Sequence, residues 1–197
     1  MSSHRVKGSS IKKSPVALFA RNFFRHPSML GSVIPSSPYL VKYLMEQIDW
    51  DRTRVVVEFG PGVGTITREV LKRMRPDALL LVIELNREFV DFLNTHVRDP
   101  RLRIVHGSAI EVRNILAEHG IASADCIISS IPYSLIPETQ RQEIVLESRQ
   151  ALQAQGSLLV FQYNRRLLPY LKSSFSSVKL DIHYLNILPA LVFHCTP

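Results

Sequence analysis

Arg54-Val-Val-Val-Glu-Phe-Gly-Pro-Gly-Val-Gly-Thr65 joins an apolar run to a turn that carries glycine at every second position. The run at 54–59 is rich in valine and does not alternate with polar residues, which is typical of a parallel strand buried on both faces. Glycine permits a tight turn and lets the main chain approach a ligand closely. A helical pattern begins at residue 64. This segment therefore predicts a strand, a glycine-rich turn and a helix.

The rest of the chain repeats the alternation of apolar runs and helical patterns. The runs that predict strands are 54–59, 79–84, 102–106, 125–129 and 157–163, and helices are predicted near 64–75, 86–97, 110–119, 138–152 and 165–174. Two more runs, 181–188 and 191–195, flank Pro189 and predict an antiparallel finish. An earlier helix is predicted to start with Ser37 as its cap and Pro38 in its first turn. These elements predict an α/β domain with a doubly wound, Rossmann-like sheet of about seven mostly parallel strands and an antiparallel last strand.

Length and composition exclude several classes of protein. The 197 residues, 46% hydrophobic and 21% charged, fit one globular domain and exclude a disordered chain or a disulfide scaffold. The longest strongly apolar run, 78–83, is far shorter than the roughly 20 residues of a membrane span. No credible signal peptide precedes the first helix. Cys126 and Cys195 both lie in apolar runs, so we expect a reduced, cytoplasmic compartment.

The positive charge is concentrated at the N-terminus. Residues 1–45 hold seven Lys or Arg and no Asp or Glu, whereas the remainder holds 17 of each sign. A helical wheel of 14–25 places phenylalanines on one face and basic residues opposite. We expect a basic N-terminal segment, 1–36, whose helix lies on an anionic membrane surface or covers the following domain, 37–197, as a lid. The residues expected at the membrane are Lys12, Lys13, Phe19, Arg21, Phe23 and Arg25.

A ribose site is predicted by Glu84, which ends the second strand 22 residues after Gly62, because an acid there can accept bonds from both ribose hydroxyls. The glycine pattern, with Glu58 two residues ahead of Gly60, resembles the first motif of class I S-adenosylmethionine-dependent methyltransferases. The resemblance implies the class I methyltransferase fold, with S-adenosylmethionine as cofactor and S-adenosylhomocysteine as product. It places adenine at 107–109, although Ser108 stands where many members carry Asp. The implied cofactor residues are Glu58, Gly60, Gly62, Gly64, Thr65, Glu84, Leu85, Ser108, Ala109 and Ser129.

The segment Ser129-Ser130-Ile131-Pro132-Tyr133 follows the fourth strand. It is similar to the Asn-Leu-Pro-Tyr loop of methyltransferases that act on adenine N6, with Ser130 in the place of Asn. The resemblance implies that a polar group and the carbonyl before Pro132 hold the acceptor nitrogen, and that the ring of Tyr133 stacks on the substrate. The implied catalytic residues are Ser129, Ser130, Pro132 and Tyr133.

Two further segments narrow the resemblance to one group of methyltransferases. Residues 24–37, FRHPSMLGSVIPSS, resemble the entry segment of bacterial phospholipid N-methyltransferases, and 185–193, LNILPALVF, resemble their ending. The likeness covers roughly 20–195 and departs from that family at Asn164-Arg165, where Gly-Pro is expected. It implies methylation of the amine of phosphatidylethanolamine, towards phosphatidylcholine, by a peripheral enzyme on the inner face of the cytoplasmic membrane. The substrate-binding residues it implies are Ser36, Tyr133, Tyr163 and Arg165.

Two alternatives stay open. An RNA adenine-N6 methyltransferase shares the cofactor motifs and a basic N-terminus, but such enzymes add a helical domain after the sheet, and the second half of this sequence is formally neutral. A non-catalytic protein that binds S-adenosylmethionine or lipid is the other. The seven histidines are scattered, so no metal site is expected. The identity of the lipid, the number of methyl groups, any general base and the oligomeric state stay open.

Overall fold

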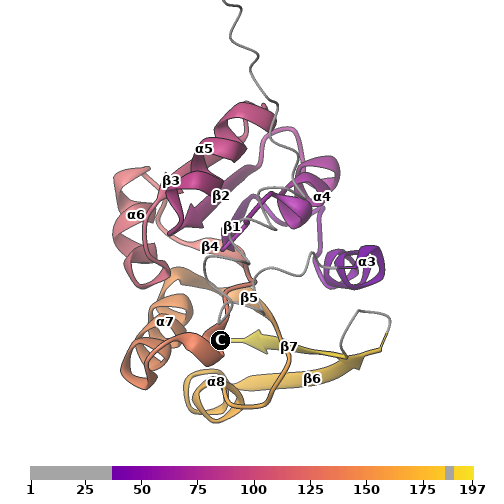
Figure 1. Ribbon diagram of the computed structural model, residues 1–197, viewed down its shortest axis with the longest axis vertical. Helices are drawn as coiled ribbons and strands as arrows, with labels where there is room; N and C mark the ends of the chain where they lie inside the picture. The colour runs from indigo at the N-terminus through magenta and orange to yellow at the C-terminus, as the bar shows by residue number, and fades with distance from the viewer. Residues whose placement is uncertain (1–36, 185–188) are drawn as a thin grey trace, which may run out of the picture.

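One seven-stranded sheet forms the centre of the computed structural model, which describes residues 37–184 and 189–197. The strand order is β3-β2-β1-β4-β5-β7-β6, and β7 runs antiparallel to both of its neighbours (Figure 1). This confirms the predicted doubly wound sheet with an antiparallel last strand. The strands are β1 Val55–Phe59, β2 Leu79–Glu84, β3 Leu102–His106, β4 Ala124–Ser129, β5 Leu152–Gln162, β6 Ser177–His183 and β7 Ala190–Thr196.

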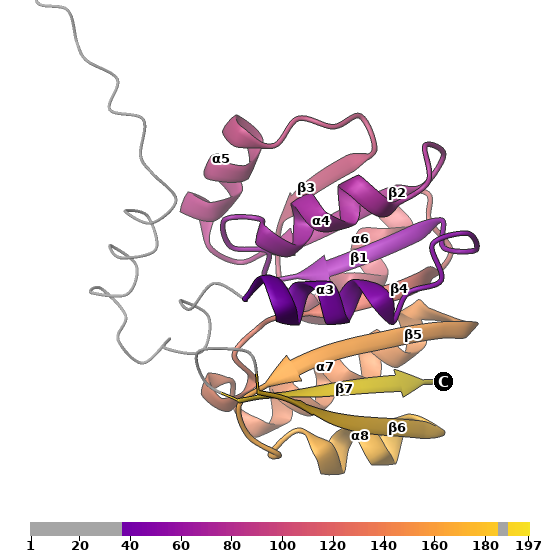
Figure 2. The same cartoon turned by 90° about the vertical axis from the view of Figure 1, so that its right-hand side faces the viewer.

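The helices cover both faces of the sheet. Three of them, α3 Pro38–Glu46, α4 Thr65–Arg73 and α5 Arg87–His96, pack on one face. The other face carries α6 Val112–Glu118, α7 Glu138–Ala151 and α8 Leu168–Ser174, as Figures 1 and 2 show from two sides. Two short 3-10 helices, η2 Ala109–Glu111 and η3 Tyr133–Leu135, follow β3 and β4. Helix α3 begins as predicted, because the Ser37 Oγ accepts a hydrogen bond from the Leu40 N–H at 3.1 Å.

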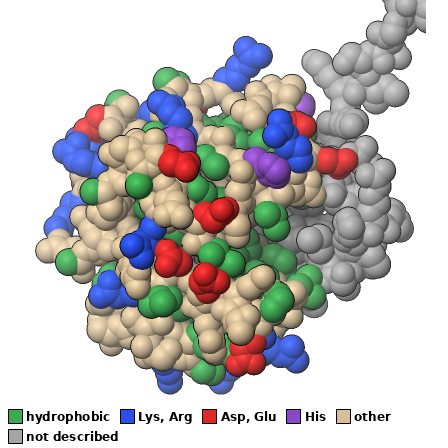
Figure 3. Space-filling view, turned by 90° about the vertical axis from the view of Figure 1, so that its left-hand side faces the viewer, with side chains coloured by type: hydrophobic (Ala, Val, Ile, Leu, Met, Phe, Trp, Pro, Cys, Tyr) green, Lys and Arg blue, Asp and Glu red, His purple; other side chains and the backbone are tan. Residues whose placement is uncertain are grey.

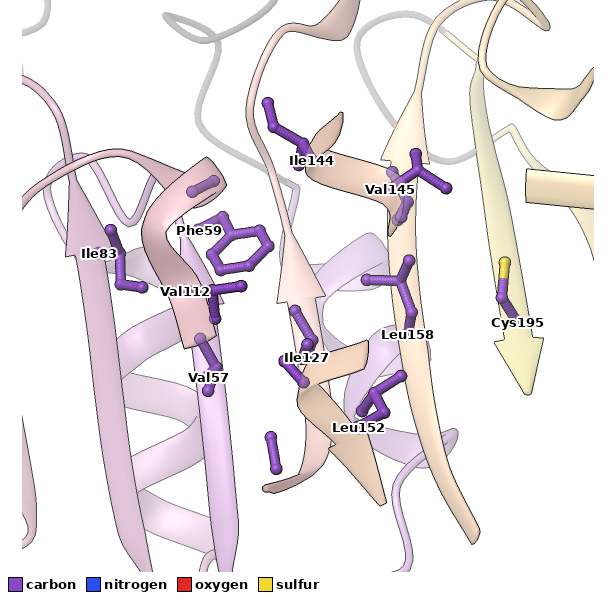
Figure 4. Close-up of a cluster of buried hydrophobic side chains, with 14 of the residues drawn as sticks. Val57, Phe59, Ile83, Val112, Ile127, Ile144, Val145, Leu152, Leu158 and Cys195 are labelled. Atoms are coloured by element: carbon purple, nitrogen blue, oxygen red, sulfur yellow. The ribbon is translucent and has the colours of Figure 1, made fainter. Parts of the chain in front are cut away.

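The core divides into two layers because successive side chains of a strand point to opposite faces. Val57 and Phe59 of β1 pack towards α6 and α7, and Figure 4 shows this layer with Val112 and Ile127. Val56 packs into the other layer, with the apolar stripe of α3. Cys126 and Cys195 are both buried free thiols. Each fully buried large side chain stabilises the fold by about 1.5–3 kcal/mol.

The junction between α7 and β5 differs from the prediction. The helix ends at Ala151, one residue early, and β5 begins at Leu152, five residues earlier than the apolar run at 157–163 indicates. Residues 153–155, Gln-Ala-Gln, are exposed, and the pairing with β4 shifts register between Ala124 and Cys126. Gly156 is needed at this irregularity, since a Cβ there would lie 3.0 Å from the Asp125 carbonyl oxygen. A hydrophobicity pattern cannot reveal an exposed strand extension of this kind.

Several predicted features lie outside the described residues. These are the helix at 14–25, Ser36 and the six expected membrane residues Lys12, Lys13, Phe19, Arg21, Phe23 and Arg25. Within residues 37–184 and 189–197, no helix has both the length and the apolar character needed to cross a bilayer.

Candidate active site

A cavity of about 420 Å³ opens at the carboxyl ends of β1, β2, β3 and β4. In Figure 2 the arrowheads of β1 and β5 point towards this edge of the sheet, and that of β7 points away. Ligands of open α/β sheets bind at this edge. Most of the cavity wall is apolar. Its lining residues are Gly60, Gly62, Ile83, Glu84, Leu85, Asn86, Phe89, Gly107, Ser108, Ala109, Ile110, Ser130, Ile131, Pro132, Leu135, Ile136, Gln140 and Ile144.

The glycine loop between β1 and α4 serves both the cavity and the core. Gly60, Gly62 and Gly64 all have positive φ, between 55° and 78°, which side-chain-bearing residues rarely adopt. Gly60 and Gly62, which were expected to bind the cofactor, line the cavity. Gly64 does not line it, and a Cβ there would lie 2.7 Å from Leu93 Cδ2 of α5. The third glycine is therefore required for helix packing, and the adjacent Thr65 begins α4 without lining the cavity.

Glu84 fixes the shape of the cavity floor. Its carboxylate accepts hydrogen bonds from the main-chain N–H groups of Gly62, at 3.1 Å, and Asn86, at 2.8 Å. The side chain is 7% exposed, and burial raises the pKa of Glu84. Asn86, which the sequence analysis missed, lines the cavity and caps α5 by accepting from the Glu88 N–H at 2.9 Å. Its position two residues after the strand end, just before a helical pattern, is a capping signal that could have identified it.

Glu58 lies in the core and does not line the cavity. It is fully buried, and one carboxylate oxygen accepts a hydrogen bond from Thr67 Oγ1 of α4 at 2.7 Å. Its Oε1 finds no hydrogen-bond donor in the described part of the chain. Burial, and to a smaller extent the nearby charge of Glu84, raises the pKa of Glu58 to about 7. Glu58 therefore ties β1 to α4, the two elements that flank the glycine loop.

The buried carboxyl of Glu58 makes stability depend on pH. Its pKa rises from 4.5 in the unfolded chain to about 7 in the fold, so the folded state binds more protons between these values. Stability is then lost as pH rises from about 4.5 to 7, by on the order of 3 kcal/mol. We expect Glu58→Gln to remove this loss, so that the variant gains stability relative to wild type between pH 5 and pH 8. Urea unfolding at both pH values measures it.

The control for this prediction is Glu118→Gln, because Glu118 is exposed at the end of α6. Its unfolding free energy should follow the wild-type pH profile. If the unfolding free energies of Glu58→Gln and Glu118→Gln both change with pH as wild type does from pH 5 to pH 8, Glu58 does not titrate in the way its burial requires.

The loop after β4 is tied to the glycine loop. The Ser130 hydroxyl is within hydrogen-bond distance of the Phe59 and Gly60 carbonyl oxygens, at 3.0 and 2.9 Å, and the Ser130 N–H also donates to Phe59 at 3.0 Å. Ser130 and Pro132, both expected to be catalytic, line the cavity. The Ser130 hydroxyl proton is directed to main-chain carbonyls, so this side chain positions the loop and retains only its lone pairs for a ligand.

Tyr133 occupies a different place from the one expected. The sequence predicts a ring that stacks on the substrate, but the side chain is 2% exposed and packs in the core. Its hydroxyl lies 3.1 Å from the Oγ of Ser129, which is itself fully buried. Burial raises the pKa of Tyr133, so the phenol stays protonated at neutral pH. Because a ring with one hydroxyl partner packs well in an apolar layer, Ser129 and Tyr133 anchor the loop from behind the cavity.

A second, smaller cavity of about 30 Å³ adjoins the first. The two share Ser130, Ile131 and Pro132, and the second is also lined by Gln162 and Tyr163 at the end of β5. Gln162, which the sequence analysis missed, is 7% exposed, and its Nε2 donates to the Ile131 carbonyl at 2.9 Å. A polar residue that ends an otherwise apolar strand is the signal that could have revealed it. Arg165 is exposed on the loop that follows.

Ser108 has a structural role in the turn after β3, at the position where many class I methyltransferases carry Asp. Ser108 and Glu111 form a reciprocal cap of η2, in which the Ser108 N–H donates to Glu111 at 3.1 Å and the Ser108 Oγ faces the Ile110 N–H at 3.4 Å. Ser108, Ala109 and Leu85, which were expected to bind the cofactor, all line the cavity. The Ser108 hydroxyl is engaged by its own turn, whereas the apolar surfaces of Leu85 and Ala109 remain available to a flat ring.

Comparisons with known proteins agree with this geometry. Residues 24–168 match the ribosomal RNA adenine dimethylase family. An ornithine lipid N-methyltransferase of Singulisphaera acidiphila is 28% identical over 184 residues, covering 90% of this chain and 94% of that protein. A ribosomal RNA small subunit methyltransferase A of Mycoplasma capricolum is 26% identical over 101 residues, which is 50% of this chain and 36% of that protein.

Solved structures share the fold at low sequence identity. The structure of human methyltransferase-like protein 13 in complex with S-adenosylhomocysteine has a TM-score of 0.62 and 14% identity, and the match covers 87% of this chain and 81% of that one. The strand order, the antiparallel β7, the glycine loop and the family match all indicate the same class of enzyme. The chain belongs to the ribosomal RNA adenine dimethylase family and is a class I S-adenosylmethionine-dependent methyltransferase.

Proposed function

We propose that the protein transfers methyl groups from S-adenosylmethionine to the amine of a membrane lipid headgroup, at the inner face of the cytoplasmic membrane. The observation that carries the proposal is the coverage of the ornithine lipid N-methyltransferase, whose 184 matched residues span nearly the whole of both chains. The ribosomal RNA methyltransferase of Mycoplasma capricolum is matched over 36% of its length. Phosphatidylethanolamine and an ornithine lipid are both candidate acceptors, because each presents a primary amine near an anionic group.

Exposed apolar side chains at the carboxyl edge of the sheet support a lipid acceptor. Among the described residues, six large apolar or aromatic side chains are exposed, and four of them belong to segments at the carboxyl edge of the sheet. Leu85 follows β2, Leu135 is in η3 after β4, and Tyr184 follows β6. Tyr39 is in the first turn of α3, whose N-terminal end lies at this edge in Figure 2. Leu85 is 72% and Tyr184 71% exposed. Tyrosine and leucine at one edge suit the interface of a bilayer, where rings and aliphatic groups enter and hydroxyls stay hydrated.

The charge distribution also favours a membrane over RNA. Residues 1–36 hold six Lys or Arg and no acid. In sequence they precede α3, whose N-terminal end lies at this same edge in Figure 2. On the face shown in Figure 3, Lys and Arg side chains are interspersed with Asp and Glu. RNA is held along an extended basic surface, whereas an anionic bilayer attracts a short basic segment by about 1 kcal/mol for each Lys or Arg. We therefore assign 1–36 to membrane contact and 37–197 to catalysis.

We propose one orientation for S-adenosylmethionine in the larger cavity. Glu84 would accept the ribose hydroxyls, Leu85, Ser108 and Ala109 would border the adenine, and Gly60 and Gly62 would face the methionine part, where an unsubstituted main chain allows close approach. The other predicted residues would support the cavity without lining it, and they are Glu58, Gly64, Thr65, Ser129 and Tyr133. Among the residues proposed for substrate binding, Tyr163 lines the smaller cavity, and Arg165 would meet the anionic group of the headgroup.

Transfer is an in-line displacement that the enzyme assists by alignment. The amine lone pair attacks the sulfonium methyl carbon, and the carbon–sulfur bond breaks with its electron pair left on sulfur. A lipid ammonium must first lose a proton, since its pKa resembles that of Lys. Tyr133 is buried and bonded to Ser129, so it does not serve as the base. Proton loss to water before the attack is consistent with the residues around Ser130.

Two acceptors separate the lipid proposal from RNA methylation. Purified protein is incubated with radiolabelled S-adenosylmethionine and anionic vesicles that contain phosphatidylethanolamine, and in parallel with unmethylated ribosomal RNA. We expect label in the lipid extract, and little label in the RNA. Vesicles without an amine lipid are the control. Label in the RNA alone would establish the second candidate, RNA adenine-N6 methylation, which the family match favours. Label in neither acceptor, with the cofactor still bound, would favour a non-catalytic protein.

A further inference from the structure

The loop after β4 continues the parallel pairing of β1 and β4 by one residue. Phe59 pairs with Ser129, and the Ser130 N–H then donates to the Phe59 carbonyl at 3.0 Å. In a parallel ladder the N–H and the carbonyl of one residue bond the two residues that flank its partner on the neighbouring strand. The Ser130 N–H bonds Phe59, so the Ser130 carbonyl would accept its hydrogen bond from the N–H of residue 61. Residue 61 is proline and has no N–H. The ladder therefore stops at the Ser130 carbonyl oxygen.

The neighbouring carbonyl is in the opposite situation. The Ile131 oxygen accepts from the Tyr133 N–H at 3.0 Å and from Gln162 Nε2 at 2.9 Å. A carbonyl has two lone pairs, so both are used. The sequence resemblance assigned the acceptor nitrogen to this carbonyl, the one before Pro132. In the structure Gln162 occupies it.

The Ser130 carbonyl is available by comparison. Within residues 37–184 and 189–197, no main-chain or side-chain donor is hydrogen-bonded to this oxygen. Ser130 also lines both the larger and the smaller cavity. Its own hydroxyl and N–H hold the residue against the glycine loop, so the carbonyl is fixed in place. A fixed main-chain oxygen on a residue that lines both cavities is a preorganised acceptor for an N–H group.

We propose that the methyl-acceptor amine docks on the main-chain carbonyl of Ser130, which Pro61 leaves without a ladder donor, while Gln162 withholds the Ile131 carbonyl. This inference rests on the proposed function, since it concerns the amine that is methylated. A neutral primary amine has two N–H groups and one lone pair. Donation of one N–H to Ser130 directs the lone pair away from that oxygen, towards the larger cavity.

The same contact strengthens during the reaction. As the nitrogen–carbon bond forms and the carbon–sulfur bond breaks, the nitrogen becomes positively charged and its N–H becomes a stronger donor. The hydrogen bond to a neutral carbonyl then changes into a charge-assisted bond, which stabilises the transition state more than the bound substrate. The extra proton of the product ammonium leaves to water. Pro61 and Gln162 are thus positioning residues for the amine.

Pro61→Ala tests the proposal because it adds the missing N–H. The main-chain N–H of the introduced alanine can donate to the Ser130 carbonyl and compete with the amine. Methyl transfer is followed at saturating S-adenosylmethionine against the mole fraction of phosphatidylethanolamine in vesicles. We expect the apparent KM for the lipid to rise, or kcat to fall, at least tenfold, with the melting temperature within a few degrees of wild type. Val63→Ala, which trims a buried side chain of the same loop without adding a donor, should keep the lipid KM.

Gln162→Leu supplies the second arm, because it releases the Ile131 carbonyl from its side-chain donor. The proposal expects the lipid KM to stay the same or to rise. A several-fold lower KM would make Ile131 the docking oxygen and overturn the proposal. Pro61→Ala with wild-type kinetics would overturn it as well. If wild type itself labels no lipid amine, the proposed function fails first, and this inference fails with it.

Discussion

Gly60→Ala is expected to lose at least 30-fold in affinity for S-adenosylhomocysteine. A Cβ on Gly60 would lie 2.8 Å from Ile131 Cγ2, closer than such atoms approach, so the Ile131 side chain or one of the two loops must shift. Both loops line the larger cavity. The positive φ of 67° adds strain of about 1–2 kcal/mol. Isothermal titration calorimetry measures the affinity, and urea unfolding measures the stability.

Gly120→Ala is the matched control for this prediction. Gly120 has a φ of 71°, close to that of Gly60, but a Cβ there meets no atom within 4 Å. The strain of a positive φ should therefore lower the free energy of unfolding by a similar amount in both variants. Only Gly60→Ala should also lose affinity for S-adenosylhomocysteine. Equal affinities for the two variants would mean that the main chain at Gly60 does not approach the ligand.

Glu84→Gln is expected to lower the affinity for S-adenosylhomocysteine about 100-fold. The carboxylate holds the N–H groups of Gly62 and Asn86, and both of its oxygens are needed if it also accepts ribose hydroxyls. An amide offers one acceptor oxygen in place of two and carries no charge. Hydrogen bonds to charged groups contribute about 1.5–3 kcal/mol, which corresponds to a tenfold to 150-fold change in affinity. Calorimetry at neutral pH is the measurement.

The control for Glu84 is Glu111→Gln. Glu111 is also an acid after a strand, but its carboxylate bonds the Ser108 N–H of its own turn and does not line the cavity. We expect its affinity to stay within a few-fold of wild type. An affinity of Glu84→Gln that matches Glu111→Gln would remove Glu84 from the cofactor site.

The cofactor half of the site could be predicted because its signals are local. Glycines at alternate positions, an acid at the end of the second strand and apolar strand runs are each visible in a few neighbouring residues, and the cavity brings Gly60, Gly62, Glu84 and Ser108 together. Gly64 shows the limit of such a motif. Its missing side chain makes room for Leu93, a packing partner 29 residues away that no local pattern identifies.

The part of the site proposed to bind the methyl acceptor could not be predicted in the same way. Its arrangement depends on strand register and side-chain burial, which the sequence does not show. Tyr133 has an apolar ring and a hydroxyl, so the same residue suits a substrate surface or the core, and only its pairing with Ser129 shows which was chosen. The missing N–H of Pro61 is visible in the sequence, but its consequence for Ser130 appears only once β1 and β4 are paired. Gln162 reaches Ile131 across the sheet edge, 31 residues back along the chain.

Transfer of a deuterated methyl group to a lipid is the decisive measurement of the proposed activity. The protein is incubated with S-adenosylmethionine that carries a trideuterated methyl group and with vesicles that contain both phosphatidylethanolamine and an ornithine lipid, and the lipids are analysed by mass spectrometry. The account predicts trideuteromethyl groups on a headgroup nitrogen of at least one lipid, and their number gives the count of methyl groups added. Unlabelled headgroups in both lipids, from protein that still binds S-adenosylhomocysteine, would contradict it.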